Sequence, residues 1–353
     1  MSDNTILERE TLRATVASLK PANNALRLCT NQLDRRAFLA DSKYHSEMQK
    51  NCYFPILWLI PEFDADLVEE GCFSVLKRKW DVSIFDLYSL VAQKHPIRMP
   101  AELLQIFLPQ ANLEFSILAN DITAARDRLD VFRAMLSLQG IHPSISPFAA
   151  NISLNKYAGI NSRSAGNQAT MHEGLREGIT HKDGQIEMWP NELSFNCIGA
   201  NNENLKSTLT ESLIIRAAKN SEKWLGLEEA QGSIRAARRA FINAPLMPDL
   251  GSSILHIWQG IESLFPTVST EITFRTSLLL AELISPLQNR AETYEASRAS
   301  YKDRSRIAHG SEKEISLQQW LRAWLLLSRA LEAVLDRGLL PNEEELTRGL
   351  LGS

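Results

Sequence analysis

The residues with the clearest capacity for chemistry are Arg304 and His309, which are separated by four residues in the segment 301–310. The imidazole of a histidine titrates near neutral pH and can transfer protons. The planar guanidinium of an arginine can bind two phosphate oxygens at once. Together, such groups can drive the 2′-hydroxyl of RNA onto the adjacent phosphorus without a metal ion. We therefore interpret Arg304 as a candidate phosphate stabiliser and His309 as a candidate proton-transfer residue.

The spacing by itself is a weak signal, because the same pattern occurs again at Arg176 and His181. That second copy lies in a stretch rich in glycine with no helical periodicity, so we interpret it as a chance match. A histidine at the end of a helix can also serve only as a cap, and this alternative remains for His309 taken alone.

A single straight helix does not bring Arg304 and His309 together. On an ideal α-helix, residues five apart diverge by about 140° and rise by about 7.5 Å. Either the helix unwinds at Gly310, or two copies of the motif meet across a two-fold axis and form a composite site in a homodimer. Because a helix C-terminus favours positive charge, His309 is expected to act as the acid.

Three predicted helices position these residues. Periodic apolar residues predict helices at 251–265, 290–309 and 316–337, and Gly310 ends the second of them. The expected buried stripe of the first helix consists of Ile254, Ile257, Trp258, Ile261, Leu264 and Phe265, and that of the third consists of Leu317, Leu321, Trp324, Leu331 and Leu335. Glu262 lies at the edge of the first stripe and needs a cation, for which Arg304 and Arg275 are the candidates. Its role is either a structural salt bridge or a part of the site.

Basic residues elsewhere in this region are candidates for RNA contacts. Arg235, Arg238 and Arg239 cluster on a predicted helix at 229–243, and Arg306 lies inside the motif segment. They could bind RNA phosphates, but a solvated helix face is the simpler interpretation of the cluster.

Two segments resemble the Apea-like branch of the HEPN domain family. The first reads Trp258-x-x-x-Glu262-x-Leu264-Phe265, and the second reads Tyr301-x-x-Arg304-Ser305-x-Ile307-x-His309-Gly310. The resemblance covers about the last third of the chain, with a core at 230–340. It implies a small, usually dimeric, all-helical bundle and metal-independent endoribonuclease activity of a toxin, antiviral-defence or abortive-infection system.

The resemblance also implies roles for individual residues. Arg304 and His309 would be catalytic, and Ser305, Glu262 and Tyr301 would support them. The most active family members usually have Asn, Asp or His where this chain has Ser305. RNA would be the substrate, and neither a cofactor nor a metal is expected. The alternative is a non-catalytic HEPN module that dimerises and binds RNA, a nucleotide or a protein partner.

The remaining sequence predicts an α+β region at 1–200 followed by the helical domain at 201–345, so that the chain is mainly α overall. Residues 53–60 read as a buried strand or core segment, 120–139 as an amphipathic helix, and 185–197 as a β-hairpin. Residues 140–182 read as a long loop or mobile segment, within which 151–157 could form one short strand. From 203 onward only helices are expected (205–224, 229–243, 251–265, 271–285, 290–309, 316–337), followed by a short acidic tail. By default the N-terminal region would be a sensor or regulator that responds to a protein or phage-derived trigger. Function could also lie in the 140–200 segment as an interaction surface, with the helical domain a scaffold.

Bulk composition limits the remaining function classes. The chain has 353 residues, a formal net charge of −4 and a pI near 6.0, which argues against a basic nucleic-acid coat protein. Its four cysteines have neither zinc-ligand spacing nor the density of a disulfide framework. The N-terminus lacks the apolar segment of a signal peptide, and no long apolar run occurs, so we expect a cytoplasmic protein without a membrane partner.

Overall fold

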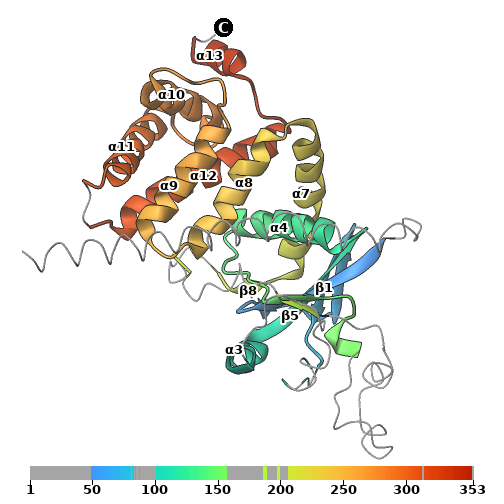
Figure 1. Cartoon of the computed structure of the whole chain (residues 1–353). Coiled ribbons are helices and arrows are strands. Elements are labelled where there is room, and N and C mark those ends of the chain that lie inside the picture. Colours follow the sequence, from blue (N-terminus) through green and yellow to red (C-terminus); the bar gives the residue numbers. More distant parts are fainter. Residues whose placement is uncertain are drawn as a thin grey trace, which may run out of the picture. The chain divides into compact units, whose positions relative to one another are not determined.

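The computed structural model describes residues 49–80, 82, 84, 87, 101–156, 186–188, 197–198, 206–311 and 314–351. An antiparallel sheet occupies the N-terminal half of this part, and helices dominate the C-terminal half (Figure 1). At this coarse level, the predicted α+β character of the N-terminal region and the predominantly helical character of the C-terminal region are confirmed. None of the helices in these ranges combines the length and apolarity needed to cross a bilayer.

The main sheet has six strands in the order β3-β4-β5-β1-β6-β7, and each neighbouring pair is antiparallel. The strands, in chain order and without β2, are β1 (Lys50–Leu57), β3 (Leu67–Glu70), β4 (Phe73–Lys77), β5 (Ala111–Ala119), β6 (Phe148–Ala150) and β7 (Ile186–Met188). A separate parallel pair joins β2 (Ile60–Pro61) to β8 (Thr208–Leu209). The strand predicted at 53–60 is thus confirmed as β1, and β7 confirms the first half of the predicted hairpin; its second half, at 192–196, lies outside the described residues.

One face of the sheet is covered by helix α4 (Ile122–Leu138) (Figure 1). The helix begins at Asp121, whose side chain accepts a hydrogen bond from the Ala124 N–H, and ends before Gly140, which has a φ of 79°. The Phe132 ring lies 5.0 Å from Phe73 on β4 and 5.1 Å from Phe115 on β5. Aromatic packing of this kind fixes α4 against strands β4 and β5.

The opposite face holds a smaller apolar cluster. Phe148 and Ala150 of β6 belong to it, whereas Ala149 belongs to the main core, as the alternation of a strand requires. The short helix α3 (Ala101–Phe107) and the 3₁₀ turn η2 (Leu108–Gln110) contribute Leu104, Phe107 and Leu108 to this cluster. The strand expected at 151–157 is wrong, because the strand lies at 148–150 and the 3₁₀ turn η3 (Leu154–Lys156) follows it.

The C-terminal half is a group of packed helices: α7 (Glu211–Ala230), α8 (Ser233–Asn243), α9 (Leu250–Ser263), α10 (Ile272–Ile284), α11 (Arg290–Ala308), α12 (Leu317–Arg337) and α13 (Glu343–Leu351). Helices α9 and α12 lie at its centre (Figure 1). Gly260 allows α9 to approach α8 closely, since a Cβ atom there would lie 2.5 Å from the Ala240 Cβ. One apolar cluster includes side chains of both the sheet and these helices.

Most predicted helices of this half are confirmed within a few residues, with three corrections. The first helix begins at Glu211 rather than at 205, and β8 precedes it although no strand was expected there. The short acidic tail forms a further helix that was not expected, α13, which buries Leu346 against the core. Leu317 is 45% exposed rather than buried, because the core face of α12 instead includes Trp320.

Candidate functional site

The motif helix α11 packs against α9, and the two helices run in opposite directions. Near one end, a Cβ atom on Gly251 would lie 3.4 Å from the Ile307 Cγ2. Near the other, the Trp258 Nε1 donates a 3.0 Å hydrogen bond to the Ser300 hydroxyl oxygen. The C-terminal end of α11, where the motif ends, therefore lies beside the first turn of α9.

Arg304 is held by contacts with α9 and with its own helix. Its Nη2 lies 3.3 Å from the Glu262 Oε1, and its guanidinium carbon lies 5.3 Å from the centre of the Tyr301 ring. The Tyr301 ring in turn packs edge-on against Trp258 with 5.0 Å between ring centres. The predicted contact of Glu262 with Arg304 is confirmed, whereas Arg275 pairs with Glu343 of α13. The guanidinium keeps about a third of its surface exposed, so it is oriented but still accessible.

His309 caps the end of α11 and is exposed. Gly310 follows with a φ of 66°, its N–H donates to the Ile307 carbonyl, and the Ser311 N–H donates to the Arg306 carbonyl. This is the hydrogen-bond pattern of a Schellman cap, which fixes the backbone on both sides of His309. The sequence prediction that Gly310 ends the helix is confirmed.

The two motif residues do not converge within one chain. The helix stays regular through Ala308, so any unwinding begins only after His309 and does not change the spacing from Arg304. The Arg304 guanidinium points back toward Tyr301 and Glu262, whereas His309 lies at the helix end. Unwinding at Gly310 therefore leaves the backbone spacing between Arg304 and His309 unchanged, and the arrangement with a second copy stays a prediction.

Two further motif residues have structural contacts. Ser305 is half-buried, and its carbonyl accepts a hydrogen bond from the His309 N–H. Sequence reasoning missed Asp303, whose buried carboxylate accepts hydrogen bonds from Arg306 at 2.5 Å and from Arg322 of α12 at 3.2 Å. An aspartate three residues before an arginine was the available signal. Asp303 joins the motif turn of α11 to α12.

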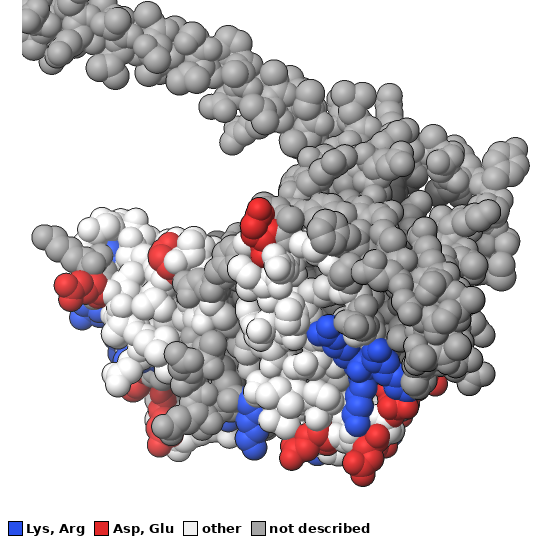
Figure 2. Space-filling model, turned by 90° about the horizontal axis from the view of Figure 1, so that it is seen from below, with Lys and Arg blue, Asp and Glu red and all other residues white. Residues whose placement is uncertain are grey.

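The basic cluster on α8 is not an open basic surface. Arg238 is completely buried and donates to Glu228 of α7, so its assignment to RNA contacts is wrong. Arg235 also pairs with Glu228, and Arg239 pairs with Asp127 of α4. Arg238 follows Ile234 by four residues, so helical spacing already placed it on the apolar face. On the face drawn in Figure 2, lysines and arginines likewise lie close to acidic residues.

Among the described residues, no group of three or more His, Cys, Asp or Glu side chains is placed to hold a metal ion. Comparison of the chain with family models, with curated proteins and with solved structures gave no match. The resemblance to Apea-like HEPN domains thus rests on the motif residues themselves.

Proposed function

We propose that the chain is a metal-independent endoribonuclease of the HEPN type that acts as an effector in a prokaryotic antiviral-defence or toxin system. The observation that carries the proposal is the placement of Arg304 between Glu262 and Tyr301, with an exposed His309 at the end of the same helix. An oriented guanidinium and an accessible imidazole are the two groups that cleavage by the RNA 2′-hydroxyl requires.

The Arg304 side chain has donors suited to a phosphate. Its Nε is buried and has no hydrogen-bond partner among the residues that the structure describes. A phosphate that accepts hydrogen bonds from Nε and Nη2 would satisfy this donor through the bidentate geometry that arginine favours. The Glu262 carboxylate would keep the guanidinium plane in place during the reaction.

The chemistry balances with one His309 and one Arg304. The neutral His309 imidazole accepts the proton of the 2′-hydroxyl while the 2′-oxygen forms a bond to phosphorus. The resulting imidazolium donates a proton to the 5′-oxygen as its bond to phosphorus breaks. Arg304 stabilises the negative charge that develops on the phosphorane oxygens. The products are a 2′,3′-cyclic phosphate end and a 5′-hydroxyl end.

A homodimer would bring Arg304 of one chain to His309 of its partner. Arg304 lies beside Glu262 and Tyr301, whereas His309 lies at the end of α11, so in this proposal the two groups that bind one phosphate come from two chains related by a two-fold axis. In this proposal the region at 1–200 senses a protein or phage-derived trigger and controls cleavage.

One observation favours a second candidate, the non-catalytic module that dimerises and binds RNA, a nucleotide or a protein partner. Arg304 already has a carboxylate partner, and Ser305 occupies the position where a more polar residue is usual in the family. If binding alone were the function, substitution of His309 would leave RNA affinity and cellular effect unchanged.

The direct test incubates purified wild-type protein and the His309→Ala variant with total tRNA and a structured mRNA in EDTA. Cleavage by the wild type alone, with 2′,3′-cyclic phosphate ends, supports the nuclease. Intact RNA from both proteins, together with RNA binding by both, supports the binding module instead.

A further inference from the structure

Three side chains of helices α10 and α11, which lie side by side in Figure 1, form an aromatic cluster at the surface. Phe274 of α10 is 52% exposed, although phenylalanine is usually buried in a core. Its ring lies edge-on to Tyr294 of α11, with 6.4 Å between the ring centres. The Arg298 guanidinium carbon lies 5.5 Å from the centre of the same tyrosine ring. The aromatic cluster of Phe274, Tyr294 and Arg298 therefore combines an exposed ring with a cation.

The aromatic cluster repeats an arrangement that the motif has two turns further along the same helix. At the motif, the Arg304 guanidinium carbon lies 5.3 Å from the centre of the Tyr301 ring. Tyr294 and Tyr301 are seven residues apart, so they lie on nearly the same face of α11, about 10.5 Å apart along its axis. One side of α11 thus carries two tyrosine–arginine pairs in a row, and the second of them contains Arg304.

The part of α11 that joins the two pairs is basic, in a chain whose formal net charge is −4. From Arg298 onward, the helix has one acidic side chain, Asp303, which is buried, and four basic ones: Arg298, Lys302, Arg304 and Arg306. Two further carboxylates reach this part, Glu262 at 3.3 Å from Arg304 and Glu295 at 4.0 Å from Arg298. Both of these pairs are open to solvent, which screens them. The surface along this helix therefore favours a negatively charged ligand.

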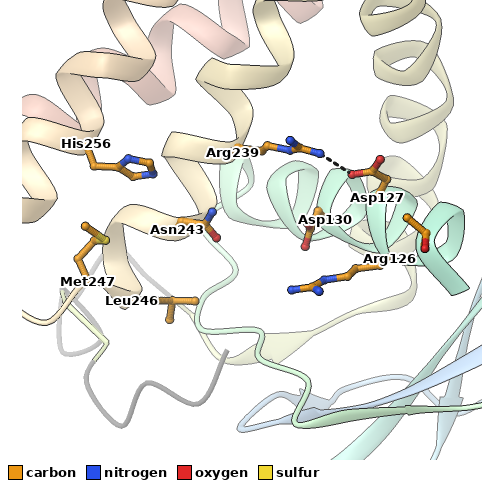
Figure 3. Close-up of a pocket in the computed structure, with 9 residues that line it drawn as sticks. Arg126, Asp127, Asp130, Arg239, Asn243, Leu246, Met247 and His256 are labelled. Atoms are coloured by element: carbon orange, nitrogen blue, oxygen red, sulfur yellow. Dashed lines mark hydrogen bonds and ion pairs between the residues drawn. The ribbon is translucent and has the colours of Figure 1, made fainter. Parts of the chain in front are cut away.

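The cleft of about 590 Å³ between α4, α8 and α9 has a different character. Its walls carry both signs of charge, because Asp127 and Asp130 lie near Arg126 and Arg239 (Figure 3). Arg239 pairs with Asp127 at 3.1 Å. Among the described residues that line this cleft, none is a Phe, Tyr or Trp. Aromatic rings and basic charge thus come together on α10 and α11 and not in the cleft.

We infer that the aromatic cluster is a stacking platform for a base of single-stranded RNA, on the strand whose phosphate binds Arg304. The inference rests on the proposed function, because that function makes RNA the ligand of Arg304. The base lies on the exposed face of the Phe274 ring, and the Arg298 guanidinium donates to a neighbouring phosphate. A stacked strand rises by about 3.4 Å per nucleotide, so this base is about three nucleotides from the phosphate at Arg304.

Binding is measured by fluorescence anisotropy on the full-length His309→Ala protein in EDTA, so that cleavage does not enter the result. The probes are a short, unstructured single-stranded RNA and a strand of the same length in which abasic residues replace the nucleosides. The abasic strand keeps every phosphate but offers no base for stacking. We expect saturable binding of the intact strand, at least about fivefold tighter than binding of the abasic strand.

Substitutions of Phe274 in the same background test the stacking. Phe274→Ala should weaken binding of the intact strand about fivefold or more and leave binding of the abasic strand unchanged, because it removes only the ring. Phe274→Trp should bind the intact strand at least as tightly as the parent, since it keeps an aromatic face. The matched control is Ile106→Ala on α3, which removes a side chain that is 59% exposed and should bind as the parent does.

Arg298→Gln separates charge from stacking. It should weaken binding of the intact and the abasic strand alike. It should also lower the slope of log affinity against log salt concentration by about 0.7, the value for one phosphate contact of a single strand. The matched control is Arg329→Gln on α12, because Arg329 is about half exposed and pairs with Glu332 three residues away, as Arg298 pairs with Glu295. This control should leave both the affinity and the slope unchanged.

Two results would overturn the inference: equal affinities of Phe274→Ala and Ile106→Ala for the intact strand, or an abasic strand that binds as tightly as the intact one. A Phe274→Ala protein with altered oligomeric state by light scattering and unaltered RNA affinity would also overturn it, and would assign the aromatic cluster to a protein interface.

The fate of the proposed nuclease is decided separately. Wild-type protein that fails to cleave RNA removes the nuclease proposal but leaves the effect of Phe274→Ala on RNA binding measurable. Conversely, cleavage by the wild type without an effect of Phe274→Ala on RNA affinity removes only this inference.

Discussion

The Arg304 Nη2 lies 3.3 Å from the Glu262 Oε1, and this ion pair links the motif helix α11 to α9. Both side chains are about one-third exposed, so solvent screens the pair and its contribution to stability is small. The pair is better placed to orient the guanidinium than to hold the fold together. This difference between orientation and stability can be measured.

Replacing Glu262 by Gln should lower activity without unfolding the protein. We expect the RNA cleavage rate to fall about ten- to a hundredfold, because loss of the carboxylate lets the Arg304 guanidinium leave its productive orientation. The free energy of unfolding should change by less than about 1 kcal/mol. Cleavage kinetics and urea denaturation measure the two quantities.

The matched control is Glu344→Gln, which removes the carboxylate of the exposed Arg348–Glu344 pair on α13. It should leave cleavage unchanged. An equal effect of both substitutions on cleavage would show that Glu262 does not orient Arg304.

For the buried pair of Arg238 and Glu228 we expect the opposite, a large effect on the free energy of unfolding. Arg238→Met should lower the free energy of unfolding by about 3–5 kcal/mol, because Glu228 would lose its buried partner. The double variant Glu228→Gln/Arg238→Met should recover much of this loss, since it leaves no unpaired charge. Urea denaturation of both variants tests this.

Arg239→Met is the comparison for that experiment, because the Arg239 side chain is 52% exposed and pairs with Asp127 at the surface. It should cost less than about 1 kcal/mol. If Arg238→Met were no more destabilising than Arg239→Met, the burial of Arg238 would be wrong.

Local sequence signals account for the parts of the fold that were predicted correctly. Asp121 and Ser316 cap the helices that follow them, and Gly140, Gly310 and Gly338 end helices with positive φ. The pairing of β1 with β5 joins segments more than fifty residues apart, and periodicity contains no information about such partners. Helix α13 did have a signal in the sequence, the capping-box pattern Asn342-x-x-Glu345, which was overlooked. Each of these two side chains accepts a hydrogen bond from the backbone N–H of the other residue.

The contacts of the candidate site were likewise only partly predictable from the sequence. Contacts between α9 and α11 were predictable, because a carboxylate beside an apolar stripe needs a cation and Arg304 was near in the motif. The burial of Arg238 depends on Glu228 of the preceding helix, and the partner of Arg239 is Asp127 of α4, a distant segment. Local spacing does not reveal such long-range partners.

Two buried titratable groups predict how stability varies with pH. Burial raises the pKa of Glu114 to about 7, despite hydrogen bonds from Ser153 and the Leu154 N–H that lower it. Burial, followed by the nearby charge of Arg133, lowers the pKa of His142 to about 4. The Glu114 contribution to stability is present below pH 4.5 and is lost as the pH rises through 7. The His142 contribution is present above pH 6.5 and is lost as the pH falls through 4.

The two contributions oppose each other between pH 4.5 and 6.5, and Glu114→Gln separates them. Its amide can still donate to the Ser153 hydroxyl and accept from the Leu154 N–H. We expect this variant to be more stable than the wild type by about 3 kcal/mol at pH 8 and to lose that advantage near pH 4. Unfolding free energies measured from pH 4 to 8 check this, and parallel curves for the two proteins would contradict it.

If Arg304 of one chain and His309 of another act on one phosphate, two inactive variants should restore each other's activity when they are mixed. Arg304→Gln and His309→Ala proteins are each assayed for RNA cleavage in EDTA, alone and after subunit exchange with each other. We expect an active wild type, two inactive variants, and recovery of about one quarter of wild-type activity in the mixture, since half of the dimers would contain one intact composite site. A mixture as inactive as its components, beside an active wild type, would place both residues in a single chain. A wild type that leaves RNA intact would contradict the nuclease itself.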